Sequence, residues 1–157
     1  MSFSGIDGEH DAILTFALSF EIPVGNNNLE GEIPDEVKAF VLMEDLNLRA
    51  NELSGSLPES MVSLRNLTLL DLELNSLEGE PMPIVIELSN LRRLRLSFND
   101  FRGVIPAEIG RLEKLRELWL GNNRFTGQLP STIGDLVELG KSRKGAQKSV
   151  VSLLYPG

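Results

Sequence analysis

Hydrophobic residues recur along the chain in a fixed pattern with a period of 24 residues. The pattern is L-x-x-L-x-L, and its last three positions alternate apolar, polar and apolar, which is typical of a short strand with one buried face. A single strand cannot bury that face alone, so the repeats predict parallel strands stacked about 4.8 Å apart, in a sheet roughly 20 Å wide. The copies are Met43, Leu46 and Leu48; Leu67, Leu70 and Leu72; Leu91, Leu94 and Leu96; Leu115, Leu118 and Leu120; and the shortened first copy Ile22 and Val24.

An asparagine follows each predicted strand with the same period. We expect each amide to point inward and to satisfy backbone groups left unpaired where the chain turns, and successive amides to form a ladder. This role is structural, because the period has no slip in five copies. The five positions are Asn27, Asn51, Asn75, Asn99 and Asn123.

Glycine and proline end each repeat. A glycine follows four residues after each asparagine, and two residues later an apolar residue and a proline follow, except in the third copy, which reads Pro81-Met82. Beyond the proline, apolar residues lie three apart, as in Ile109 and Leu112, which predicts one irregular or helical turn on the convex side. The glycines are Gly31, Gly55, Gly79, Gly103 and Gly127.

The complete unit, L-x-x-L-x-L-x-x-N-x-[LF]-x-G-x-[IL]-P, resembles the plant-type, 24-residue class of the leucine-rich repeat family. Members of this class include receptor-like kinases, receptor-like proteins and polygalacturonase-inhibiting proteins, and about 120 of the 157 residues fit the unit. The resemblance implies an α/β solenoid, a right-handed superhelix with a short parallel β-sheet on its concave face.

The two ends of the chain depart from the pattern. We expect a degenerate N-terminal repeat or cap at residues 1–18, an array of five repeats at 19–139, and an irregular tail at 140–157 that is basic and then apolar. Secreted members of the class carry paired cysteines at the ends of the array, whereas this chain has none. We therefore expect the array to belong to a longer protein.

Composition argues against several kinds of chemistry. The chain has 23 acidic and 15 basic residues, so its net charge of −8 disfavours binding to nucleic acid. Without cysteine, and with His10 as the lone histidine, it offers no thiol nucleophile and little for a metal site. No apolar run reaches the roughly 20 residues that span a bilayer. We therefore predict that the chain is not an enzyme and that it uses no cofactor or metal. We also predict that this segment does not insert into a membrane.

Binding in such a scaffold belongs to the variable positions of the strands, because packing occupies the fixed ones. Equivalent positions form four rows: Asp45, Leu69, Arg93 and Glu117; Asn47, Asp71, Arg95 and Trp119; Arg49, Glu73, Ser97 and Gly121; and Ala50, Leu74, Phe98 and Asn122. Exposed Trp and Arg dominate many binding hot spots. The alternative is a closed network in which Arg95 pairs with Asp71 and stacks on Trp119. The residues predicted to contact a ligand are Asp71, Glu73, Arg93, Arg95, Phe98, Glu117 and Trp119.

Two shorter patterns on the same face suggest more specific roles. Arg93 and Arg95 lie two residues apart. By the family resemblance, plant receptors for small secreted peptides use a similar R-x-R pair to hold the free C-terminus of the peptide. Charge balance is the alternative, because Arg92 is also basic. Asp71 and Glu73 are spaced like a glycosidase carboxylate pair, but Arg95 beside them is the simpler explanation, so hydrolysis is not expected.

The one N-x-S/T sequence is Asn66-Leu67-Thr68, just before a predicted strand. It predicts a glycosylation site at Asn66 if the chain enters a secretory pathway.

These observations favour a protein- or peptide-binding module that has no catalytic activity. By resemblance, it would be a recognition segment of a larger cell-surface receptor-like protein, located at the plasma membrane or outside the cell. The alternative is a stand-alone structural or inhibitor protein, similar to a polygalacturonase inhibitor, with acidic rows that face a basic partner. A chain that is complete as given would be cytoplasmic.

Overall fold

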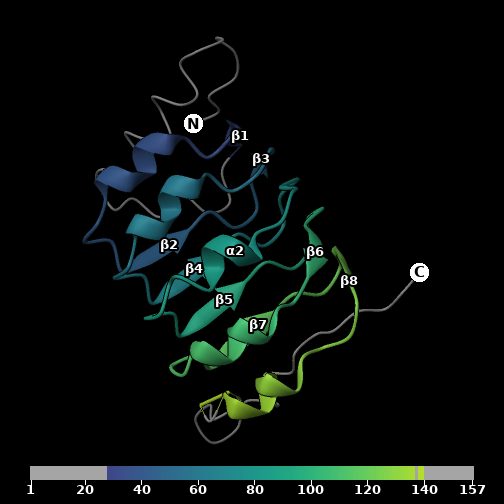
Figure 1. Cartoon of the computed structure of the whole chain (residues 1–157). Coiled ribbons are helices and arrows are strands. Elements are labelled where there is room, and N and C mark those ends of the chain that lie inside the picture. The colour runs from purple at the N-terminus through teal and green to yellow at the C-terminus, as the bar shows by residue number, and fades with distance from the viewer. Residues whose placement is uncertain (1–27, 137, 140–157) are drawn as a thin grey trace, which may run out of the picture.

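The protein forms a solenoid of short strands and single helical turns (Figure 1). The structure is a computed structural model that describes residues 28–136 and 138–139, so Asn27, the predicted N-terminal cap and the predicted tail lie outside the described residues. The elements in order are β1 (Glu30–Gly31), η1 (Asp35–Ala39), β2 (Asp45–Asn47), β3 (Glu52–Leu53), η2 (Glu59–Ser63), β4 (Leu69–Asp71), α2 (Met82–Val85), β5 (Arg93–Arg95), β6 (Arg102–Val104), η3 (Ala107–Arg111), β7 (Glu117–Trp119), β8 (Arg124–Thr126) and η4 (Ser131–Asp135).

The central sheet has the parallel order β2-β4-β5-β7. Its register is one repeat per strand, because Leu46, Leu70, Leu94 and Leu118 face one another in turn. These leucines are buried, and the residues on either side of them point to the opposite face. The period-two pattern thus predicted the strands, the period of 24 residues predicted their register, and the solenoid fold is confirmed.

A second set of strand pairs, absent from the sequence prediction, follows the asparagines. β1 pairs with β3 and β6 pairs with β8, both in parallel, while Ser56 and Glu78 form a single bridge between these pairs. The residues involved are polar and apolar in no fixed order, so no alternating pattern indicated them. Backbone hydrogen bonds between neighbouring repeats, such as Glu52 N to Leu29 O at 2.8 Å, create these strands.

The predicted turn after each proline is present as a helix. Four copies form 3-10 helices that begin after Pro34, Pro58, Pro106 and Pro130, each of which has an extended backbone. The third copy forms the short α-helix α2 instead, since Pro81 already has helical angles and Val85 N bonds back to Pro81 O at 3.0 Å. The substitution at Pro81-Met82 therefore changes the helix type without interrupting the array.

The interior is a single column of aliphatic side chains. The leucines of the strands, the apolar residues of the helices and Phe101 pack in one continuous cluster. Repeats approach so closely that a Cβ on Gly79, whose φ is +79°, would lie 2.9 Å from the Cβ of Ser56. Glycine is thus required there both for its backbone angle and for space. In the described part of the chain, no helix is long and apolar enough to cross a membrane.

Candidate functional site

The concave surface of the central sheet carries most of the predicted binding residues. Strand register sets Asp71 beside Arg95, Arg95 beside Trp119, and Arg93 beside Glu117. Glu73 follows the end of β4, and Phe98 follows the end of β5. The fold thus gathers the seven predicted residues onto three neighbouring repeats.

Arg95 is the centre of a charged network. Its Nη2 lies 2.7 Å from Glu117 Oε2, its Nε lies 3.2 Å from the same oxygen, and its Nη1 lies 3.2 Å from Asp71 Oδ2. Burial alone would lower the pKa of Arg95, but the hydrogen bonds and charges of Glu117 and Asp71 raise it above its usual value. This guanidinium is therefore a permanent cation shared by two carboxylates.

Trp119 packs against the same guanidinium. The Cζ of Arg95 lies 4.7 Å from the centroid of the Trp119 ring, within range of a cation–π interaction. Both contacts of the closed network considered from the sequence are therefore present. Trp119 remains partly exposed, so a ligand could still contact the ring.

Asp71 is buried despite its charge, with 1% of its surface exposed. Burial raises its pKa above the usual value of 3.8, and this effect outweighs the opposing effect of the hydrogen bond and positive charge of Arg95. Its Oδ1 also accepts a hydrogen bond from the backbone N of Glu73 at 3.2 Å. Asp71 thus depends on Arg95 for the stability of its charged form.

Glu73 is buried as well and forms an ion pair with Arg49 of the preceding repeat. The two carboxylates that resemble a glycosidase pair are therefore each bound to an arginine on a neighbouring strand or turn. Within residues 28–136 and 138–139, no group of three or more His, Cys, Asp or Glu side chains is arranged to hold a metal ion.

Arg93 differs from Arg95. Its side chain makes no hydrogen bond or ion pair with any residue that the structure describes, although its charge acts on Asp71. The neighbouring Glu117 is already bound to Arg95. Of the two arginines in the R-x-R pattern, Arg93 is the one that forms no ion pair with the described residues, and it is half-buried.

The row that precedes the ladder asparagines has an unexpected backbone. Ala50, Leu74, Phe98 and Asn122 all have positive φ angles, of 54°, 61°, 58° and 54°. Leu74 and Phe98 are also exposed, at 40% and 48% of their surface. The sequence pattern led to Phe98 as a binding residue but not to Leu74 or to the backbone angle. The sequence did offer one signal for the backbone angle. The residues of this row all lie immediately before a ladder asparagine, and the last copy has Asn122 there, a residue type that tolerates a positive φ.

The ladder asparagines make inward hydrogen bonds in every described copy. Asn75 Oδ1 accepts from Leu53 N at 3.1 Å, and its Nδ2 donates to Leu48 O at 3.0 Å and Leu72 O at 3.1 Å. Asn99 repeats this pattern one repeat later, with Leu77 N and Leu72 O. Each amide therefore joins its own strand end to the preceding repeat.

Asn66 is exposed in the turn before β4. Its Nδ2 donates a hydrogen bond to Val41 O at 2.8 Å. An amide nitrogen carries two hydrogens, so this bond leaves one for a glycan linkage. Glycosylation there stays a prediction.

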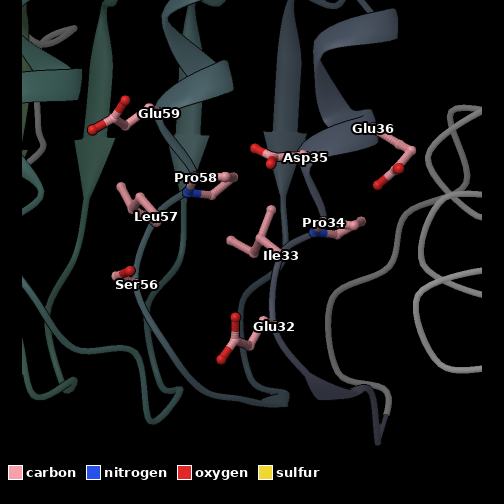
Figure 2. Close-up of a pocket in the computed structure, with 9 residues that line it drawn as sticks. All are labelled: Glu32, Ile33, Pro34, Asp35, Glu36, Ser56, Leu57, Pro58 and Glu59. Atoms are coloured by element: carbon pink, nitrogen blue, oxygen red, sulfur yellow. The ribbon is translucent and has the colours of Figure 1, made fainter. Parts of the chain in front are cut away.

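A pocket of about 640 Å³ lies between the first two described repeats and shares no residue with the rows of the concave face. It is formed by residues 32–36 and 56–59, which lead into η1 and η2. Figure 2 shows Ile33 and Leu57 in the middle of the view, with the carboxylates of Asp35, Glu36 and Glu59 above them and that of Glu32 below. The lining is acidic, so this surface attracts cations.

Comparison with known proteins agrees with this architecture. The family described as Leucine Rich Repeat matches residues 90–112 and 114–136. No curated protein matches the sequence.

Three solved structures illustrate the likeness. The LRR ectodomain of the plant membrane receptor kinase GASSHO1/SCHENGEN3 from Arabidopsis thaliana, in complex with CASPARIAN STRIP INTEGRITY FACTOR 2, is 36% identical, with a TM-score of 0.72 over 75% of this chain and 14% of that chain. The BIR3–SERK2 complex from Arabidopsis thaliana is 36% identical, with a TM-score of 0.68 over 71% of this chain and 60% of that chain. A plant ice-binding protein is 32% identical, with a TM-score of 0.69 over 73% of this chain and 38% of that chain. This chain thus spans less than two thirds of each.

Proposed function

The chain belongs to the plant-type leucine-rich repeat family, and on that premise we propose that it binds a protein or peptide through the concave face of its central sheet. The observation that carries this proposal is the combination of Arg93, which has no ion-pair partner among the described residues, and the partly exposed Trp119 on the neighbouring strand. Both are held on a rigid parallel sheet. A preformed surface loses little entropy on binding.

Several solved relatives support a protein or peptide as the partner. The GASSHO1/SCHENGEN3 ectodomain is in complex with CASPARIAN STRIP INTEGRITY FACTOR 2, and BIR3 is in complex with SERK2. By analogy, this chain acts as a recognition segment of a larger cell-surface receptor-like protein and has no catalytic activity. The ice-binding relative shows that one solenoid serves different functions, so the proposal depends on the site and not on the fold.

The alternative is a stand-alone inhibitor that binds a basic partner. In that case acidic residues would dominate the contact. On the concave face, however, Asp71 and Glu117 are bound to Arg95, and Glu73 is bound to Arg49. Binding that weakens steeply with added salt and survives the loss of Arg93 would favour this alternative.

A peptide selection tests the proposal. The full chain is immobilised and selected against a phage library of random peptides of about twelve residues, and the enriched peptides are synthesised and titrated by calorimetry. We expect Arg93→Ala/Trp119→Ala to weaken binding at least tenfold, which corresponds to about 1.4 kcal/mol. The matched control is Arg92→Ala, which removes the adjacent exposed arginine outside the concave rows. No enriched peptide, or equal binding by the double variant, would contradict the proposal.

A further inference from the structure

Two bulky apolar residues occupy backbone positions that disfavour them. Leu74 and Phe98 stand in the left-handed region, and lateral hydrogen bonds hold them there: Leu74 N donates to Ser97 O at 3.1 Å, and Phe98 N donates to Gly121 O at 3.0 Å. A bulky residue in this region is an outlier, because its Cβ crowds the backbone. The fold itself therefore gains nothing from leucine or phenylalanine at these positions.

Their side chains do not stabilise the core either. Leu74 and Phe98 are 40% and 48% exposed, whereas the leucines of the strands are almost fully buried. The next repeat has Asn122 at the equivalent position with the same backbone angle. Asparagine tolerates that angle and is well solvated at a surface, so a less strained and more polar choice exists within this very chain.

Strain and apolar exposure together indicate a site at which something binds. Resting on the proposed function, we infer that Leu74 and Phe98 form an apolar docking site for an extended segment of a partner protein, and that an acidic group of the same segment pairs with Arg93. The two side chains belong to neighbouring repeats, whose strands are about 4.8 Å apart. One apolar side chain of a partner can thus contact both.

The charge of Arg93 determines the second feature of the partner segment, an acidic residue. Arg95 and Arg49 are already neutralised by carboxylates, so Arg93 is the concave arginine that the described residues leave without an ion pair. It precedes Phe98 by five residues on the same repeat, which limits their separation to about 17 Å along an extended chain. A partner segment therefore reaches both with an apolar and an acidic residue no more than about five positions apart.

The test uses the peptides selected on the full chain. We expect them to share an aromatic or aliphatic residue and an acidic residue within about five positions. Leu74→Asn/Phe98→Asn should weaken their binding at least tenfold, while Val104→Asn, which changes an even more exposed apolar residue on β6, should leave it within twofold. The urea midpoint of the double variant should stay unchanged or rise. If the urea midpoint falls, the variant Leu74→Ala/Phe98→Ala is used in the binding test in place of the asparagine variant. Alanine already occupies the equivalent position at Ala50 with a similar backbone angle.

Three results would overturn the inference. Peptides that need Arg93 and Trp119 but bind the Leu74 and Phe98 variants as well as wild type would leave the proposed function standing and remove this docking site. An equal loss of peptide binding in Val104→Asn would mean that the peptides bind exposed apolar residues anywhere on the surface. A concentration-dependent dimer in sedimentation that dissociates in the double variant would identify the occupant as a second copy of this chain.

Discussion

At the scale of single residues, the concave face is governed by the burial of Asp71. Its carboxylate is 1% exposed, and its raised pKa shows that burial outweighs the nearby positive charges. The group therefore favours folding most when protonated: this contribution is present below the usual pKa of 3.8 and is lost as pH rises through the raised folded value. Arg95 limits that loss, because it favours the charged form.

Removal of Arg95 should therefore make stability more sensitive to pH. In Arg95→Ala the pKa of Asp71 should rise further, and the variant should lose about 3 kcal/mol of unfolding free energy at pH 7, because a buried carboxylate is left without its partner. The deficit should shrink towards pH 3, where Asp71 is protonated. Carbon-13 NMR titration of the carboxyl group and urea unfolding at both pH values measure these effects. Arg111→Ala is the control, and an unmoved Asp71 pKa in Arg95→Ala would refute the coupling.

The sequence predicted which side chains would lie next to one another, but not which of them would be buried or paired. The period of 24 set Arg95 beside Asp71 and Trp119. Three features depend on side-chain directions that spacing does not predict: the burial of Asp71, the bonds from Arg95 to Glu117, and the lack of an ion pair between Arg93 and any described residue. The positive φ of Leu74 was not predicted either, because leucine rarely adopts a left-handed backbone and its presence does not indicate one.

At the scale of elements, the asparagine ladder joins each strand to the preceding repeat. Asn75 bridges the backbone of Leu48 and Leu53 in one repeat to Leu72 in the next. The period of the asparagines predicted this role. The second set of strands, β1 with β3 and β6 with β8, was not predicted, because their stability depends on backbone bonds between repeats and not on an alternating pattern.

Loss of one ladder amide should be costly. Asn75→Ala leaves Leu53 N and the carbonyl groups of Leu48 and Leu72 without that partner, so we expect the free energy of unfolding to fall by about 1 to 3 kcal/mol. Asn90→Ala is the matched control, because the Asn90 amide bonds Arg65 O and Lys114 Nζ at the surface, where water can replace it. Its loss should cost less, about 0.5 to 1 kcal/mol. Equal urea midpoints for the two variants would show that the ladder is not what stabilises the turns.

At the scale of the whole molecule, charge and packing both vary along the solenoid. Residues 28–89 contain 13 acidic and 3 basic side chains, whereas residues 90–136 contain 5 acidic and 8 basic ones. The acidic pocket lies in the first part and Arg93 in the second. Packing also differs among the described 3-10 helices, because η1, η2 and η3 each bury a residue and η4 buries none.

Local stability should follow this packing. In hydrogen–deuterium exchange, we expect the amides of Leu72 and Leu96, which bond to Arg95 O and Trp119 O in the central sheet, to be among the slowest. The amide of Ile133 in η4 should exchange much faster, although it also forms a backbone hydrogen bond. The amide of Ile109, in the buried helix η3, is the matched control. Equal protection of Ile109 and Ile133 would show that the array opens as one unit.

The sequence by itself determined the repeat, the strand register and the place of the ladder, because each follows from a period that the chain repeats in one dimension. Tertiary structure alone decided which charges are paired, which carboxylate is buried, and which apolar residues remain outside. Those properties arise between residues about 24 positions apart, where burial, dielectric environment and backbone angle depend on the neighbouring repeat. Asp71, Arg93 and Leu74 all lie in the rows of the concave face, yet only the packed solenoid shows that Asp71 is buried, that Arg93 has no ion pair with the described residues, and that Leu74 is exposed with a positive φ.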